Sequence, residues 1–186
     1  MSDVTRLLHR AKAGDRAALD ELLPAVYDEL HRIASRQVAR ERSGHTLQPT
    51  ALVNEAFIRM FENQPPDAND RRHFIGIASR VMRQVLVDYA RTRSARKRAG
   101  IQIALKDHHA TAPVPPTDVL LIDAALDRLG AEDPASVRLI EMRFFGGMTT
   151  EEIAEAQGVS VSTIRHHLRY AQAWLRQSLD DPGGRA

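Results

Sequence analysis

A run of hydrogen-bond donors near the C-terminal end of the chain could bind DNA. It contains Ser162, Thr163, Arg165, His166, His167, Arg169 and Tyr170, and no acidic residue follows until Asp180. Guanidinium, imidazole and hydroxyl groups can contact phosphates and base edges in the major groove, whereas the phosphates repel a carboxylate. The segment is therefore predicted to be a DNA-recognition helix.

The residues around this run predict a helix-turn-helix that would position it. Thr149 and Glu152 have the spacing of a capping box at the start of a first helix. Gly158 suits the left-handed position that ends this helix, and Ser160 suits the N-cap of the next. Five residues at helical spacing then form a predicted buried stripe: Val161, Ile164, Leu168, Ala171 and Leu175. An ordinary amphipathic helix pair is the alternative interpretation.

A second group of basic residues lies on a long helix predicted to begin near Asp70 or Arg71. Its apolar stripe is predicted at Phe74, Ile77, Ala78, Val81, Val85 and Tyr89. Against the single acid Asp88, the rest of the segment carries Arg71, Arg72, Arg80, Arg83, Arg91, Arg93, Arg96, Lys97 and Arg98. A solvated face is the simple explanation of a charge run, but so strong an imbalance favours a phosphate-binding surface.

Apolar residues recur at helical spacing through most of the chain, and no convincing strand pattern is present. Further helices are predicted over residues 3–13, from about 19 to 42, from Pro49 through Phe61, from 120 to a stop at Gly130, and from Asp133-Pro134 to Gly146. The stripes of the last two comprise Leu120, Leu121, Ala124, Ala125, Leu129, Val137, Ile140, Met142 and Phe144.

These elements predict an all-α protein with two small helical domains. Residues 1–98 form the first domain, the proline-bearing residues 99–117 form a flexible linker, 118–179 form the helix-turn-helix domain, and 180–186 form a tail.

The composition argues against several classes of protein. The chain has no cysteine, so it has no disulfide, thiolate metal site or cysteine nucleophile. No apolar run approaches the roughly eighteen residues of a membrane span, and the N-terminal residues lack the apolar core of a signal peptide. His108 and His109 have no other ligands nearby in the sequence, and no Gly-rich phosphate loop is present. We therefore expect a soluble, cytoplasmic protein that is not an enzyme and needs no metal or cofactor.

Three segments carry a resemblance to a known family. They are Leu52-Val53-Asn54-Glu55-Ala56-Phe57-Ile58-Arg59-Met60-Phe61; Ile77-Ala78 with Val87-Asp88-Tyr89-Ala90-Arg91; and Glu152-Ile153-Ala154 through Leu168. In this order and spacing they resemble a bacterial sigma factor of the extracytoplasmic-function (ECF) type, over nearly the whole chain. The three segments resemble, respectively, the polymerase-binding segment, the helix that engages the −10 element, and the region that reads the −35 element.

The resemblance implies core RNA polymerase and promoter DNA as partners. On the polymerase, the implied contacts are the clamp helices of the largest subunit and the flap of the second-largest subunit. Leu52, Val53, Asn54, Glu55 and Phe57 would bind the clamp helices. The arginine-rich helix would engage and open the −10 element, residues 162–170 would read −35, and Asn69 could hydrogen-bond an extruded −10 base. For Asn69, a plain turn residue is an equal alternative.

One departure from the family pattern concerns Thr50. Many family members place carboxylates just before Leu-Val, where the polymerase presents arginines, but this chain has Leu47-Gln48-Pro49-Thr50-Ala51 and no acid until Glu55. A phosphate on Thr50 would add about two negative charges at the helix end that favours them. We therefore hypothesise that a Ser/Thr kinase activates the protein at Thr50, as is thought for some similar ECF groups. Control by an anti-sigma factor, and a threonine that merely fits a helix start, remain the alternatives.

An autonomous helix-turn-helix regulator is the alternative function, because response-regulator output domains have a similar Glu-Ile-Ala segment. A receiver domain would show alternating strands and helices in the first hundred residues. This half of the chain is instead predicted to be helical and rich in arginine, which favours the sigma factor.

Overall fold

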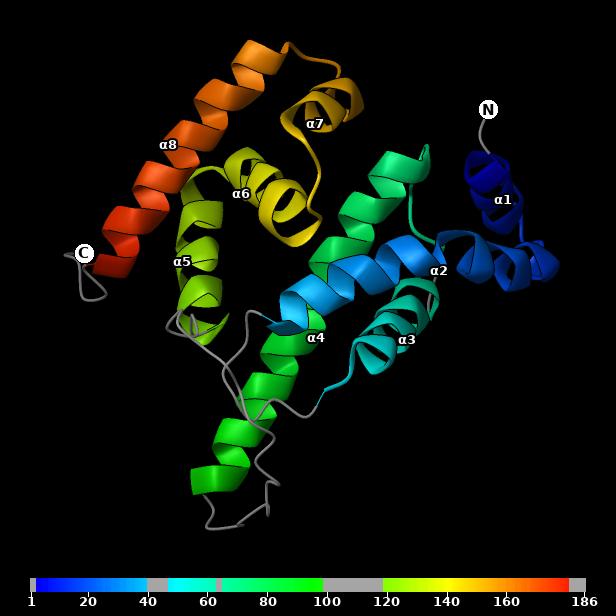
Figure 1. The fold of residues 1–186 in the computed structure, drawn as a ribbon, viewed down its shortest axis with the longest axis horizontal. Coiled ribbons are helices and arrows are strands. Elements are labelled where there is room, and N and C mark those ends of the chain that lie inside the picture. The colour runs from blue at the N-terminus through cyan, green and yellow to red at the C-terminus, as the bar shows by residue number, and fades with distance from the viewer. Residues whose placement is uncertain (1–2, 40–46, 63–64, 99–118, 181–186) are drawn as a thin grey trace.

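The computed structural model describes residues 3–39, 47–62, 65–98 and 119–180 of the chain. Within these ranges the protein is entirely helical and has no strand, which confirms the predicted all-α fold (Figure 1). The elements in order are α1 (Asp3–Lys12), α2 (Arg16–Ala39), α3 (Pro49–Phe61), α4 (Arg71–Arg98), α5 (Val119–Glu132), α6 (Pro134–Ile140), the π-helical turn η1 (Glu141–Phe145), α7 (Thr150–Gln157) and α8 (Val161–Asp180).

The described helices enclose two hydrophobic clusters, and we call the sets of helices around them the N-terminal half and the C-terminal half. The N-terminal half is built by α1–α4 around Leu22, Leu30, Leu52 and Phe74, and the C-terminal half by α5–α8 around residues such as Leu129. Helix α4 lies between them, in contact with α2 and α3 on one side and with α5, η1 and α7 on the other (Figure 1). The predicted linker 99–117, including His108 and His109, and tail residues 181–186 lie outside the described residues.

This double contact explains why α4 buries more than the predicted stripe. Phe74, Ala78 and Val85 are buried as expected, but Ile77, Val81 and Tyr89 are only half-buried. The additional buried apolar residues are Ile75, Met82, Leu86 and Val87. A helix covered on two sides has no single apolar face, so its periodicity in the sequence is blurred.

The helix-turn-helix follows its local sequence signals. The Thr149 hydroxyl accepts a hydrogen bond from the Glu152 amide at 3.1 Å, and the Glu152 carboxylate accepts one from the Thr149 amide at 2.7 Å. Gly158 ends α7 at a φ of 65°, where a side chain would be strained. The Ser160 hydroxyl accepts from the Thr163 amide at 3.1 Å at the start of α8. The predicted capping box, left-handed glycine and N-cap are thus confirmed, and the α8 stripe is buried at Ile164, Leu168 and Ala171.

The predicted stop at Gly130 is wrong. Helix α5 runs through Gly130 to Glu132, and the Asp133 amide still donates to the Leu129 carbonyl at 2.7 Å. The break comes at Asp133, whose carboxylate accepts from the amides of Ala135 and Ser136 at 3.0 Å and caps α6. The Ser136 hydroxyl, followed by these amides, holds the pKa of Asp133 below its ordinary value. The buried face of α5 also differs from the prediction and comprises Val119, Asp123, Ala125, Leu126 and Leu129.

The helix predicted to end at Gly146 changes character at Glu141. It continues as the π-helical turn η1, in which the Gly146 amide donates to the Glu141 carbonyl five residues back at 2.8 Å. The wider turn directs Glu141 and Met142 inward and leaves Phe144 37% exposed, although Phe144 was predicted to be in the buried stripe. No helix within the described residues is long and apolar enough to cross a membrane.

We expect Thr149→Ala to lower the free energy of unfolding of the C-terminal half by about 1 kcal/mol, because α7 loses its capping hydroxyl. Urea unfolding followed by the fluorescence of Trp174, the single tryptophan of the chain, measures this change. Thr150→Ala, one residue into the helix, is the control and should leave the midpoint almost unchanged. Equal loss from both variants would show that the cap contributes nothing specific.

Candidate functional site

The α8 residues predicted to contact DNA share one open face. Ser162, Arg165, His166, His167, Arg169 and Tyr170 are exposed, and Thr163 is half-buried. At the start of the helix the Ser160 hydroxyl lies 2.8 Å from that of Ser162 and 2.7 Å from that of Thr163. Arg165 makes an exposed ion pair with Glu151 of α7 at 3.1 Å, which holds its guanidinium loosely across the turn. This arrangement can present donors to a groove or to phosphates.

The predicted −10 cations of α4 are mostly paired with carboxylates. Arg71 contacts Glu29 of α2 at 2.8 Å. The other pairs cross to the C-terminal half: Arg72 with Glu155, Arg80 with Glu141 at 3.9 Å, and Arg91 with Asp123 at 3.0 Å. The hydrogen bond from Arg72 to Glu155 raises the pKa of the guanidinium. In this conformation the part of the predicted phosphate-binding surface whose side chains are described is therefore largely neutralised by acids of the same chain.

Arg83 departs furthest from its predicted role as a DNA contact, because its side chain is buried between the two halves. Its guanidinium donates to the Asp123 carboxylate of α5 and, at 2.9 Å, to the Glu141 carboxylate of η1. Arg83, Asp123 and Glu141 are 6, 7 and 2% exposed. The Phe145 ring covers the guanidinium with its centroid 5.9 Å away. Arg83 cannot reach DNA while the two halves are joined in this way.

Asp123 and Glu141 were not predicted from the sequence as partners of α4. Each is an acid inside an apolar stretch, Asp123 beside Ile122 and Glu141 between Ile140 and Met142. A buried carboxylate requires a charged or hydrogen-bonded partner, so an acid inside an apolar stretch could have indicated a buried ion pair. What the sequence did not show was which of the many arginines would supply the partner.

The remaining predicted −10 residues fall into two groups. Asn69 is exposed, and its backbone amide donates to the His73 ring nitrogen at 3.4 Å, whereas Arg93 is half-buried. The side chains of Arg96, Lys97 and Arg98 lie outside what the structure describes, although their backbone continues α4.

A close backbone approach accompanies the ion pairs. Gly146 follows η1, and a Cβ atom at this position would lie 2.7 Å from the Met142 carbonyl oxygen and 2.9 Å from the Ser79 hydroxyl of α4. The Gln37 side chain of α2 donates to the Phe145 carbonyl at 3.1 Å. The joint between the halves thus combines charge pairing, a hydrogen bond and a contact that only glycine permits without displacement.

The predicted polymerase-binding segment on α3 divides into core and surface residues. Leu52 and Val53 are completely buried in the N-terminal half, so they hold α3 in place and do not face a partner. Asn54 is exposed, Glu55 pairs with Arg59 at 2.8 Å, and the half-buried Phe57 lies against Phe61. Ile58, one turn after Asn54, is 61% exposed and was not singled out from the sequence. The surface that α3 offers is centred on Asn54 and Ile58.

Thr50 lies at the open start of this helix. Its side chain is exposed, and the Tyr27 hydroxyl of α2 donates to its hydroxyl oxygen at 3.5 Å. Gln48 at the N-cap makes no side-chain capping bond, and Pro49 occupies the first turn. The α3 N-terminus therefore has no side-chain acceptor from its N-cap residue, and its dipole favours negative charge.

Among the described residues, no three His, Asp or Glu side chains are grouped so that they could hold a metal ion.

Similarity to known proteins extends over nearly the whole chain. A family model described as ECF sigma factor matches residues 1–181. The chain is also 27% identical over 174 residues to the ECF RNA polymerase sigma factor SigL of Mycobacterium tuberculosis, in strains Erdman, CDC 1551 and H37Rv. The alignment covers 92% of this chain and 96% of SigL.

Neutralising Asp123 should loosen the joint between the halves, because Arg83 would be left buried with only one of its two carboxylates. Removing one partner of a buried ion pair typically costs about 3–5 kcal/mol, and Glu141 should keep the loss near the lower value. We expect Asp123→Ala to unfold at lower urea concentration and to show a larger radius of gyration by small-angle X-ray scattering. Asp127→Ala, an exposed acid on the same helix, is the control. Indistinguishable behaviour of the two variants would contradict the structural role of the Arg83 pair.

Proposed function

The chain belongs to the ECF sigma factor family and thus acts with core RNA polymerase and promoter DNA in transcription initiation, and we propose that three helices divide this work. Helix α3 docks on the clamp helices of the largest polymerase subunit. Helix α4, with Asn69 in the loop before it, engages the −10 element. Helix α8 reads the −35 element. The observation that carries the proposal is the exposed face of α8, which presents Arg165, His166, Arg169 and Tyr170 with no acid among them.

The geometry of α7 and α8 supports the −35 assignment. A recognition helix contacts base edges through residues near its N-terminus, and the capped start of α8 brings Ser162 and Thr163 there. Arg165 can grip guanine or a phosphate with two hydrogen bonds, exchanging its exposed pair with Glu151 for the DNA. A receiver domain would contain strands as well as helices, but the described residues among the first hundred form helices only. This favours a sigma factor over a response regulator.

The paired state of α4 implies a conformational change in this mechanism. Arg72, Arg80, Arg83 and Arg91 would exchange the carboxylates of the C-terminal half for the phosphates and bases of the −10 region. Because both states pair each guanidinium with an anion, the exchange avoids the cost of leaving Arg83 buried alone. Polymerase binding would supply the free energy that separates the halves.

Phosphorylation of Thr50 is the second part of the proposal. The exposed hydroxyl is accessible to a Ser/Thr kinase, and the α3 N-terminus favours an added phosphate. The Tyr27 hydroxyl, already 3.5 Å from the Thr50 oxygen, is placed to donate to it. The modified turn would lie one helical turn from Asn54 and present to the polymerase the negative charge that the sequence otherwise lacks there.

Arg165→Ala should weaken promoter use about tenfold or more, because it removes a two-bond contact to the DNA. The measurement is run-off transcription by core polymerase on a promoter mapped in cells that overproduce the protein, with intact and scrambled −35 elements. Arg138→Ala, an exposed arginine on α6, is the control. If the variant retains full dependence on the −35 sequence, α8 does not read it. If core polymerase gains no promoter-dependent initiation from the wild type, the proposed function fails.

Phosphorylated protein should bind core polymerase about two- to thirtyfold more tightly than unmodified protein, since each of the roughly two added charges, paired with a basic group of the polymerase, contributes about 0.2–1 kcal/mol. Thr50→Glu should bind between the two, and Thr50→Ala should match the unmodified protein and resist activation by kinase. Fluorescence anisotropy of labelled protein titrated with core polymerase measures these affinities. Thr92→Glu on the exposed side of α4 controls for charge added elsewhere. Equal affinities for all Thr50 forms would eliminate the switch.

A further inference from the structure

The helix proposed to read −35 is open while the two halves are joined. Helix α8 packs against α5, α6 and α7 of its own half and lies at the edge of the molecule away from α1–α3 (Figure 1). Arg165 pairs with Glu151, but the two side chains are 63 and 61% exposed, so solvent screens the pair and DNA can replace the carboxylate. The DNA-reading face of α8 is therefore available before the halves separate.

Helix α4, proposed to engage −10, is closed in the same state. The buried Arg83 guanidinium is held by the carboxylates of Asp123 and Glu141. At the start of the helix, Arg72 pairs with Glu155 of α7. Buried ion pairs are screened by salt much less than exposed ones, so free DNA does not readily displace the carboxylates from Arg83. The joint therefore withholds α4 from DNA.

The joined state also holds the two helices too close together to bridge a promoter. Glu151 of α7 pairs with Arg165 of α8. One helical turn later on α7, Glu155 pairs with Arg72 of α4. The two arginines therefore lie within roughly 20 Å of one another. The −35 and −10 elements are about 25 base pairs apart by their numbering, which is about 85 Å along the DNA. Helix α4 has 28 residues and is about 42 Å long, so even its far end does not make up the difference. One joined molecule can therefore occupy only one element.

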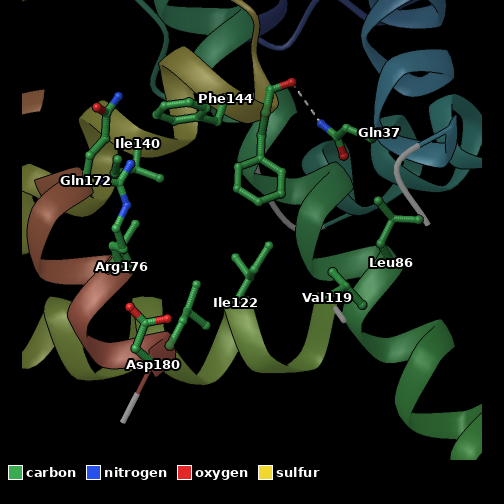
Figure 2. Close-up of a pocket in the computed structure, with 12 residues that line it drawn as sticks. Gln37, Leu86, Val119, Ile122, Ile140, Phe144, Gln172, Arg176 and Asp180 are labelled. Atoms are coloured by element: carbon green, nitrogen blue, oxygen red, sulfur yellow. Dashed lines mark hydrogen bonds between the residues drawn. The ribbon is translucent and has the colours of Figure 1, made fainter. Parts of the chain in front are cut away.

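The joint can open because its apolar contact is incomplete. A cavity of about 650 Å³ remains between the halves, lined by residues such as Leu86 of α4 and Ile122 of α5 (Figure 2). The Gln37 amide donates across the joint to the Phe145 carbonyl at 3.1 Å, and Figure 2 shows this bond at the cavity wall. Apolar surface that faces a cavity loses part of its contact energy. The joint therefore relies more on its charged and polar pairs than a filled interface would.

We propose that the free chain, in its joined state, binds duplex −35 DNA through α8 without polymerase, and that the joint withholds α4 from the −10 element until the halves separate. The carboxylates of Asp123, Glu141 and Glu155 act as an internal competitor for the α4 arginines. Binding of −35 therefore precedes binding of −10. The assignment of these two elements rests on the proposed function, whereas the difference in openness between α8 and α4 does not.

A reversible lock of the joint tests the first half of the proposal. A Cβ atom at position 146 would lie 2.9 Å from the Ser79 hydroxyl oxygen, which brings the Cβ atoms of the two positions close enough for a disulfide, about 3.5–4.5 Å. Because the chain has no cysteine, Ser79→Cys with Gly146→Cys provides the only pair that diamide can oxidise. A cysteine at 146 displaces the Met142 carbonyl slightly, so the reduced double variant is the reference.

Fluorescence anisotropy of labelled DNA, with no polymerase present, measures binding by the locked chain. The probes are a −35 duplex from the promoter used for run-off transcription and the same duplex with the element scrambled. We expect the oxidised double variant to bind the −35 duplex as tightly as the reduced one, and about tenfold more tightly than the scrambled duplex. Ser79→Cys alone, which has no partner cysteine, controls for the oxidant. Loss of −35 binding on oxidation would overturn the proposal.

Asp123→Ala tests the second half, because it loosens the joint. We expect this variant to bind a labelled single strand carrying the −10 element about tenfold more tightly than the wild type, since it frees α4 arginines for phosphates. Its affinity for the −35 duplex should not change. Asp127→Ala removes the same charge from an exposed position on α5 and controls for charge alone. An affinity for the −10 strand that rises equally in both variants, or in neither, would refute the masking of α4.

Run-off transcription distinguishes failure of this proposal from failure of the proposed function. Core polymerase with the oxidised double variant should give no promoter-dependent transcript, and reduction with dithiothreitol should restore it. If the locked chain initiates as well as the reduced one, the joint does not withhold α4, and the proposed function stands without it. If the wild type binds the −35 duplex but supports no promoter-dependent initiation, the proposed function fails instead.

Discussion

The buried Arg83 guanidinium, held between Asp123 and Glu141, governs how the rest of the described structure is arranged. Asp123 belongs to α5 and Glu141 to η1. A single side chain of α4 therefore joins these two elements of the C-terminal half to the N-terminal half. Burying three charges costs several kcal/mol per ion, and only close pairing offsets this. The interface is therefore specific in its geometry and modest in its net stability, as the proposed opening of the joint would require. The close approach of Gly146 to Ser79 and the Gln37 bond to Phe145 follow from this alignment.

Helix α4 serves both as a core element and as the proposed DNA-binding surface, and the ion pairs reconcile these roles. Its apolar residues on two faces complete the cores, while its arginines meet carboxylates where DNA would otherwise supply phosphates. An arginine suits either partner, because its planar donors match carboxylate and phosphate alike. The acids Asp123, Glu141 and Glu155 thus resemble the DNA backbone in charge.

The parts of the structure that could be predicted depend on short-range signals. The capping box of Thr149 and Glu152, the turn at Gly158 and the α8 stripe each depend on local spacing in the sequence. The first two are confirmed, and the stripe is buried at Ile164, Leu168 and Ala171 but only half-buried at Val161 and Leu175. The stop at Gly130 failed because glycine can also continue a helix when the true cap, Asp133, follows. The pairing of Arg83 joins residues 40 and 58 positions apart, and helical periodicity carries no information on such partners. For the same reason the α4 arginines were predicted as one phosphate-binding set, and no partner for Arg83 within the chain was predicted.

The proposed phosphorylation of Thr50 would act on the equilibrium between the joined and the separated halves. A phosphate on Thr50 would strengthen the interaction of α3 with polymerase, and this interaction would provide free energy for opening the joint. Such an effector can shift the balance only by its difference in affinity between the two states. Since α4 contacts α3 on one side and α5 and η1 on the other, it is the element through which the effect would reach the joint.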